Sequence, residues 1–245
     1  MPDPAVQRRH FAGAATRHFR WQTGGGYFSE SERALLASTR LPLAGRLLEI
    51  GCGEGGNLIN LADGGDGAGW AGIDFVPAKV AHAREHLPAA AFCAADAEQL
   101  PFDDGAFDGV LIRDVLHHAR DRARVLAEAV RVLAPGGVLA AVEPNRGSPL
   151  ILVQALFVPA ERGVLGSHAA RISEELRGAG LDEVEVERAQ PLPLVRLLHP
   201  ALGLDRLSAS PWARSTLAAA DQALSRIMPR WAWMYVVARG KKVAP

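Results

Sequence analysis

The segment LLEIGCGEGG, residues 47–56, constrains the fold of this chain more than any other. A short apolar run ends in a turn with three glycines, Gly51, Gly53 and Gly55, and apolar residues then recur at helical spacing. This pattern predicts a strand, a turn and a helix. Glycines permit positive φ and let a ligand press directly on the backbone, at the edge of the sheet where such folds bind ligands. A tight turn without a ligand is the alternative.

Strand and helix patterns alternate along the first 145 residues. The apolar segments expected as strands are residues 46–50, 70–75, 91–96, 107–114 and 138–144. One helix between them stops at Pro88, and another, over residues 122–133, is followed by the turn Pro-Gly-Gly at 135–137. Five strands separated by helices predict a parallel, doubly wound sheet with right-handed crossovers.

The alternation loosens beyond Pro144. A helix is expected over residues 169–177, a half-exposed strand over 183–187 and a last strand over 233–240.

Two segments do not fit this alternation, residues 145–166 and residues 189–230. Connections of that length inside a compact domain are usually functional, so we expect cap-like inserts. We also expect residues 1–40 to form an N-terminal flap or helical leader on a main domain of residues 41–245, because Gly24 to Gly26 would make a hinge beside aromatic residues.

Composition excludes several classes of protein. Lys plus Arg and Asp plus Glu both number 27, with no long run of like charge, which argues against nucleic-acid binding. Two cysteines, Cys52 and Cys93, are too few for a disulfide scaffold or a four-ligand metal site, so no metal is expected. The chain shows no secretory signal and no apolar run of the roughly 20 residues that span a bilayer. We therefore expect a cytoplasmic protein.

Asp74 ends the second expected strand, where an acid accepts hydrogen bonds from ribose hydroxyls. The glycine turn GCGEGG formally satisfies the pattern of NAD-dependent oxidoreductases. However, Glu49 and Glu54 beside the turn would repel a pyrophosphate. The ligand should therefore be a nucleoside that is cationic or neutral at this point.

Taken in order, five segments resemble the class I S-adenosylmethionine-dependent methyltransferases, in the group that includes quinone and small-molecule methyltransferases. The segments are LLEIGCGEGG, GIDFVP at 72–77, AADAEQLPFDDGAFD at 94–108, GVLIRDVLHH at 109–118 and RVLAPGGVLAAVEP at 131–144. The third and fifth argue against the NAD reading. The resemblance implies an α/β, Rossmann-like, doubly wound seven-stranded sheet, mostly parallel with an antiparallel terminal strand, in three α/β/α layers.

The resemblance also implies the roles of individual residues toward S-adenosylmethionine, with S-adenosylhomocysteine as product. Asp74 would bind the ribose with Phe75 beside the adenine, and Asp96 and the amide of Ala97 would read the adenine edge. The residues expected at the methionine end are Glu49, Gly51, Cys52 and Gly53, with backbone carbonyls of Ile112 and Arg113 toward the ammonium.

Methyl transfer from a sulfonium depends mainly on positioning, and a base is needed only when the nucleophile carries a proton. The candidates at the end of the fourth strand are Asp114, His117 and His118. We take His118 as the base, with Tyr27 of the N-terminal flap as its partner, because some small-amine methyltransferases of similar pattern pair these residue types. Packing without catalysis is the alternative.

The expected acceptor is a small or lipid-like molecule methylated at oxygen, nitrogen or carbon, and no nucleic acid. The apolar stripe that includes Leu224 and Ile227, followed by Trp231, would suit such an acceptor, an interface or peripheral contact with a membrane. A non-catalytic protein that binds the cofactor as a sensor or partner module has the same glycines and aspartates, so this second function remains open.

Overall fold

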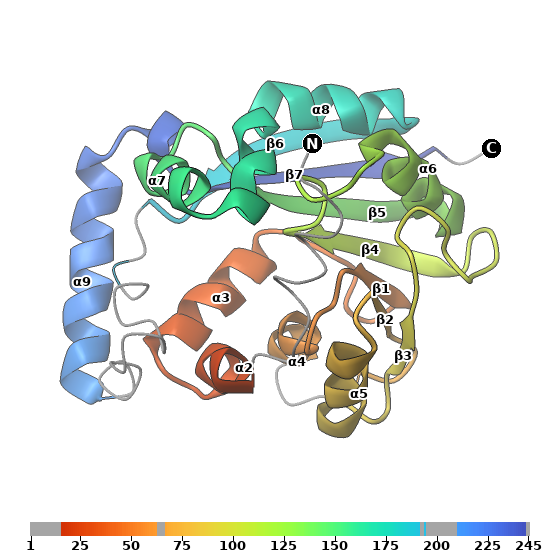
Figure 1. Cartoon of the computed structure of the whole chain (residues 1–245), viewed down its shortest axis with the longest axis horizontal. Helices are drawn as coiled ribbons and strands as arrows, with labels where there is room; N and C mark the ends of the chain where they lie inside the picture. The colour runs from red at the N-terminus through yellow and green to blue at the C-terminus, as the bar shows by residue number, and fades with distance from the viewer. Residues whose placement is uncertain (1–15, 63–66, 192–193, 195–209, 244–245) are drawn as a thin grey trace.

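The computed structural model describes residues 16–62, 67–191, 194 and 210–243. Its centre is one seven-stranded sheet in the order β3-β2-β1-β4-β5-β7-β6 (Figure 1). The strands are β1 (Leu47–Ile50), β2 (Ala71–Asp74), β3 (Ala91–Ala94), β4 (Phe107–Arg113), β5 (Leu133–Pro144), β6 (Leu181–Ala189) and β7 (Tyr235–Lys242). Strands β1 to β5 pair in parallel, and β7 is antiparallel to both β5 and β6. The predicted fold class is confirmed.

Helices cover both faces of the sheet because the buried side chains of each strand alternate between them. One face packs against α3 (Tyr27–Ala37), α4 (Gly56–Ala62), α5 (Pro77–His86), α7 (Pro149–Phe157) and the 3-10 helix η1 (Pro159–Gly166). The other face packs against α6 (Arg122–Val132) and α8 (Ala169–Gly178). Leu47 and Leu111 belong to the first face, which places Glu49 and Arg113 on that face as well.

The strands lie within two residues of where the sequence predicts them, except that β5 begins five residues earlier. The Pro-Gly-Gly segment expected as a turn is already part of β5, which starts at Leu133 directly after α6. Gly136 has φ 76° there, and Phe107 pairs with Leu133 before the register shifts to Gly109 with Val138. The glycines therefore form an irregular strand start next to β4.

The N-terminal segment folds as α2 (Thr16–Thr23) and α3, joined by Gly24 to Gly26. Trp21 and Phe28 stack with ring centroids 3.8 Å apart, and both are buried. The described part of the flap therefore packs as two helices, whereas the hinge motion stays a prediction.

The two expected inserts are helical where they are described. Residues 145–166 form α7 and η1, and the second insert contains α9 (Pro211–Ile227), which lies beside α3 (Figure 1). The short 3-10 helix η5 (Arg230–Ala232) then leads into β7. Residues 192–193 and 195–209 of the second insert lie outside the described residues.

Candidate cofactor and acceptor site

A cavity of about 890 Å³ opens at the carboxyl ends of β1, β2, β3 and β4. Residues from α2 and α3 also line it, so the N-terminal helices form one wall. Of the residues predicted to hold the cofactor, the cavity lining includes Gly51, Cys52, Gly53, Asp74, Phe75, Asp96, Ala97 and Arg113. Glu49 and Ile112 are buried beside the cavity and are not part of its lining.

The glycine turn after β1 is held tightly against β2. The amides of Gly51 and Cys52 both donate to the carbonyl of Ile73 at 2.8 Å. Gly51 has φ 77°, and a Cβ there would collide with the side chain of Val115. Gly53 has φ 53° with open space at its Cβ position. Position 51 therefore accepts only glycine, whereas Gly53 exposes its backbone to the cavity.

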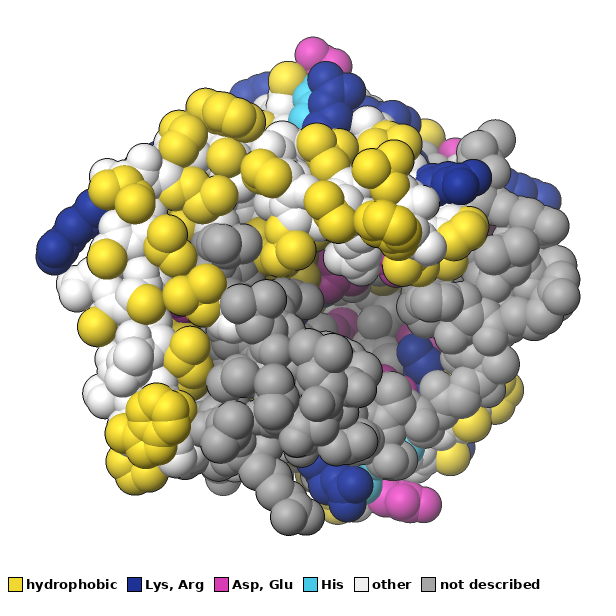
Figure 2. Space-filling view, turned by 60° about the vertical axis from the view of Figure 1, so that its left-hand side comes forward, with side chains coloured by type: hydrophobic (Ala, Val, Ile, Leu, Met, Phe, Trp, Pro, Cys, Tyr) yellow, Lys and Arg dark blue, Asp and Glu magenta, His cyan; other side chains and the backbone are white. Residues whose placement is uncertain are grey.

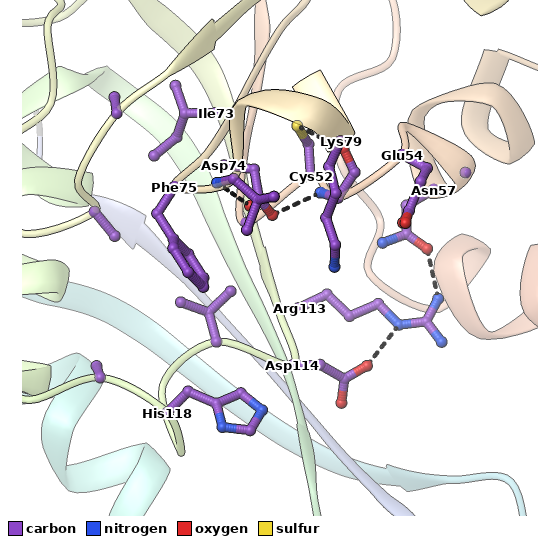
Figure 3. A pocket seen from close by; sticks show the side chains of 18 of the residues that line it. Cys52, Glu54, Asn57, Ile73, Asp74, Phe75, Lys79, Arg113, Asp114 and His118 are labelled. Carbon is purple, nitrogen blue, oxygen red and sulfur yellow. Dashed lines mark hydrogen bonds and ion pairs between the residues drawn. The ribbon is translucent and has the colours of Figure 1, made fainter. Parts of the chain in front are cut away.

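Asp74 at the end of β2 ties the second strand to the glycine turn. Its Oδ2 accepts from the amide of Gly53 at 3.0 Å, and its Oδ1 accepts from the amide of Val76 at 2.9 Å. Burial raises the pKa of Asp74, although these two amides and the charge of Lys79 oppose the rise. Each oxygen keeps acceptor capacity toward the cavity, as a ribose-binding carboxylate requires. Figure 3 shows Asp74 and Phe75 together on this wall.

The adenine end predicted from the sequence lies at the end of β3. Asp96 caps a tight turn in which its Oδ1 accepts from the amide of Glu98 at 2.9 Å. Ala97 lines the cavity beside it, and Phe75 is half exposed at its mouth. The structure therefore brings Asp74, Phe75, Asp96 and Ala97 to one end of the cavity.

Glu49 takes part in a buried polar network beside the other end of the cavity. Its Oε1 accepts from Nδ2 of Asn57 at 2.6 Å, whereas its Oε2 accepts no hydrogen bond from any described residue. Burial raises the pKa of Glu49 to about 7, and the bond from Asn57 and the charge of Arg113 limit that rise. An unsatisfied buried carboxylate oxygen favours a cationic ligand nearby.

Arg113 connects this network to the N-terminal helices. Its guanidinium donates to Oε2 of Glu32 on α3 at 2.5 Å and to Oδ1 of Asn57 at 2.8 Å, and it lies 3.4 Å from Asp114. Gln22 of α2 donates to the same Asn57 oxygen at 2.9 Å. Figure 3 shows Arg113 between Asn57 and Asp114.

The sequence reasoning used only the backbone of Arg113 and missed Glu32, Gln22 and Asn57. The alternation of β4 could have placed the Arg113 side chain on the face covered by α3 and α4. Nothing in the spacing of α2 and α3 identifies its partners.

His118 lines the cavity, whereas His117 is buried behind it. Nδ1 of His117 is 2.7 Å from Oε2 of Glu143, and Glu143 also accepts from the amides of residues 115–117. Burial would lower the pKa of His117, but the charge of Glu143 and hydrogen bonds to Glu143 and Glu161 raise it to about 10. The pairing with Glu143 thus favours the charged form of His117 and gives this residue a structural role.

Glu161 of η1 is a residue that the sequence reasoning missed. Its carboxylate lies 3.9 Å from Nε2 of His118 and 3.5 Å from Nε2 of His117. Donor atoms of these three residues lie within 4.8 Å of one another. The short distances between the Glu161 carboxylate and both imidazoles are those of an ion-pair cluster, and we interpret the group in this way.

The structure does not bring Tyr27 to His118. The Tyr27 hydroxyl donates to Oδ2 of Asp221 on α9 at 2.7 Å, and Tyr27 lines a second pocket of about 410 Å³ between α3, β6 and α9. The predicted pair is wrong for this conformation because Tyr27 begins α3 on the side that faces α9. The carboxylate that faces His118 comes from the insert after β5.

Carboxylates outnumber cationic side chains in the cavity lining. The acids are Glu32, Glu54, Asp74, Asp96, Glu98 and Asp114, and the Lys and Arg residues are Lys79, Arg113 and Arg120. Such a lining fits a ligand with net positive charge and disfavours a pyrophosphate.

The sheet order, the antiparallel β7 and the acids at the ends of β2 and β3 define the class I fold of S-adenosylmethionine-dependent methyltransferases. Comparison with protein families agrees, because residues 48–141 match the family described as methyltransferase domain. This part of the chain is therefore similar to a methyltransferase domain, and the fold is that of the class I enzymes.

Two curated relatives illustrate the similarity. The phthiotriol/phenolphthiotriol dimycocerosates methyltransferase of Mycobacterium leprae is 42% identical over 106 residues, which cover 42% of this chain and 39% of the relative. The 27-O-demethylrifamycin SV methyltransferase of Amycolatopsis mediterranei is 35% identical over 181 residues, 65% of this chain and 62% of the relative. The matched part thus spans between two fifths and two thirds of the length of these relatives.

Among solved structures, phosphoethanolamine N-methyltransferase 2 of Haemonchus contortus, in complex with phosphomonomethylethanolamine and S-adenosylhomocysteine, matches with a TM-score of 0.71. It is 19% identical, and the match covers 98% of this chain and 60% of that chain. At this identity the likeness shows the fold alone.

Proposed function

We propose that this protein transfers a methyl group from S-adenosylmethionine to a small or lipid-like acceptor. The observation that carries the proposal is the acid-lined cavity that joins Asp74, Asp96 and the glycine turn at the strand ends. Its charge suits a sulfonium nucleoside. The names of the relatives mention phthiotriol dimycocerosates, 27-O-demethylrifamycin SV and, for a relative from Thermus thermophilus, demethylmenaquinone, which supports this acceptor class.

In the proposed complex, Asp74 binds the ribose hydroxyls, and Asp96 with the amide of Ala97 recognises the adenine. The backbone of Gly51, Cys52 and Gly53 contacts the methionine part. Glu49 compensates the positive charge from behind the turn, and the backbone of Ile112 and Arg113 faces the ammonium group. When bound, the cofactor supplies an electrophilic methyl group on a sulfonium.

The chain's own contribution is positioning and exclusion of water. Phe28 and Gln22 close the cavity from the N-terminal helices, which keeps the acceptor aligned. His118 receives the proton when the acceptor is a hydroxyl or a protonated amine, and Glu161 stabilises the imidazolium that forms. We place the reaction in the cytoplasm on the composition of the chain.

Incubation with methyl-labelled S-adenosylmethionine and fractionated small-molecule and lipid extracts tests the proposal. Wild-type protein should give a labelled product, and Asp74→Ala should give none. Cofactor binding without product in any fraction would instead favour the sensor reading. Label found only in added nucleic acid would contradict the proposed acceptor class.

A further inference from the structure

An apolar face covers the outer side of α7, η1 and η5 and the end of α9. We define it by the exposed side chains of Leu152, Val153, Leu156, Phe157, Leu165, Ile227 and Trp231. Phe157 is 80% exposed, Ile227 78%, Leu156 71% and Trp231 61%. Figure 2 shows hydrophobic side chains gathered along the margin of a hollow in which acidic side chains are visible.

This face is not the ordinary outer side of a surface helix. α7 buries Ile151 and Ala155 against the sheet and turns leucine, valine and phenylalanine outward. α8 also lies on the surface, yet it exposes Arg171, Glu174 and Arg177. Large contiguous apolar surface of this kind marks an interaction site.

Asn145 holds together two parts of the face that are distant in the sequence, the start of α7 and η5. Its Nδ2 donates to the carbonyls of Trp231 at 2.8 Å and Trp233 at 2.7 Å, and its amide donates to the carbonyl of Met234. The start of α7 is thereby fixed against η5, so Trp231 lies beside the entrance to α7. α7 follows β5 and η5 precedes β7, so both elements are attached to the paired ends of these two strands.

The exposed charged side chains close to the face in sequence are mainly arginines. Residues 144–160 and 222–234 contain no Asp or Glu, and Glu161 of η1 lies against His117 and His118. Arg146, Arg162, Arg226 and Arg230 are exposed and lie in or next to the segments that carry the face. Exposed aromatic and aliphatic side chains flanked by arginines match the chemistry of an anionic lipid surface.

We infer that this apolar face seats the protein on the surface of an anionic lipid bilayer. Among the described residues no helix is long and apolar enough to cross a membrane, so the contact would be peripheral. η1 carries Glu161 toward His118 and Leu165 toward the apolar face. η1 therefore connects the apolar face with the carboxylate that faces His118 at the cavity wall.

Co-sedimentation with vesicles tests the inference and does not depend on methyl transfer. A failure of membrane binding can therefore be distinguished from a failure of the proposed function. The wild-type protein should bind phosphatidylcholine vesicles containing phosphatidylglycerol on the order of tenfold more tightly than phosphatidylcholine alone, and salt should weaken that binding. The double variant Leu156→Gln, Phe157→Gln should lose at least about tenfold in affinity. The charge variant Arg146→Gln, Arg230→Gln should lose the preference for anionic lipid.

The matched control is Leu43→Gln, because Leu43 is an exposed leucine that precedes the amino end of β1, whereas α7 follows the carboxyl end of β5. It should bind vesicles like wild type, and circular dichroism should show that all variants are folded. Equal loss in the control, or no sedimentation with either vesicle, would overturn the inference. A wild-type dimer that the apolar double variant dissociates, without vesicle binding, would assign the face to a second copy of the chain and also overturn it.

Discussion

Arg113 at the end of β4 and Glu32 on α3 form an ion pair whose two side chains are 4% and 2% exposed. The pair joins the N-terminal helices to the end of β4, directly before the catalytic candidates. It also fixes Asn57, through which Arg113 reaches Glu49. Hydrogen bonds thus connect α3, the end of β4 and the buried Glu49 into one network beside the cavity.

Glu32→Gln should destabilise the protein by about 3 kcal/mol, because it leaves the Arg113 guanidinium buried without a full counter-charge. Urea denaturation followed by circular dichroism measures the loss. The control is Glu183→Gln, whose pair with Lys241 is exposed on both sides and whose removal should hardly move the midpoint. Equal effects of the two variants would show that the buried ion pair contributes no more to stability than the exposed one.

Gly53→Ala should weaken cofactor binding on the order of tenfold while costing only about 1 kcal/mol of stability. Its φ of 53° strains any L-residue, but its Cβ would meet open space. Gly105→Ala is the matched control, since Gly105 has φ 68° and lies outside the cavity lining. It should show a similar stability loss with unchanged affinity. Normal cofactor binding by Gly53→Ala would show that the turn does not contact the cofactor at this position.

Cofactor affinity should rise by up to about tenfold between about pH 6 and pH 8, because Glu49 ionises there and its carboxylate favours a cationic ligand. Calorimetry in buffers of different ionisation enthalpy should detect a released proton. The raised pKa of Glu49 also means that its contribution to folding stability, full below its ordinary pKa, is lost as pH rises through about 7. Glu49→Gln should flatten both profiles, and an unchanged slope in this variant would contradict the assignment.

His118→Ala should lower kcat on the order of 100-fold with an acceptor that carries a proton, and Glu161→Gln should lower it less. Tyr27→Phe should leave kcat unchanged, because the Tyr27 hydroxyl is engaged by Asp221. Steady-state assays over a range of pH check these results. A kcat of His118→Ala within about twofold of the wild-type value would contradict the assignment of His118 as the base.

The sequence predicts the sheet because its strands are short apolar runs with turn residues at both ends, and the loop after each strand brings Asp74, Asp96 and the glycine turn to one edge. Alternation along β1 and β4 likewise puts Glu49 and Arg113 on one face. These features depend on local pattern and on a topology with few alternatives.

The partners of those residues could not be predicted in the same way. Glu32 meets Arg113 only because α3 packs over β4, and Glu161 reaches His118 only because residues 159–166 fold back as η1. Tyr27 contacts Asp221 instead of His118 because α3 packs beside α9, and the sequence does not indicate this packing. Such contacts are tertiary and leave no periodic signal.

Isothermal titration of the wild-type chain with S-adenosylhomocysteine tests the central claim most directly, with NAD as the competing ligand and Asp74→Ala as the matched variant. The account predicts saturable binding of S-adenosylhomocysteine at one site, no heat with NAD, and no binding to folded Asp74→Ala. Binding of NAD in its place, or undiminished binding by Asp74→Ala, would contradict it.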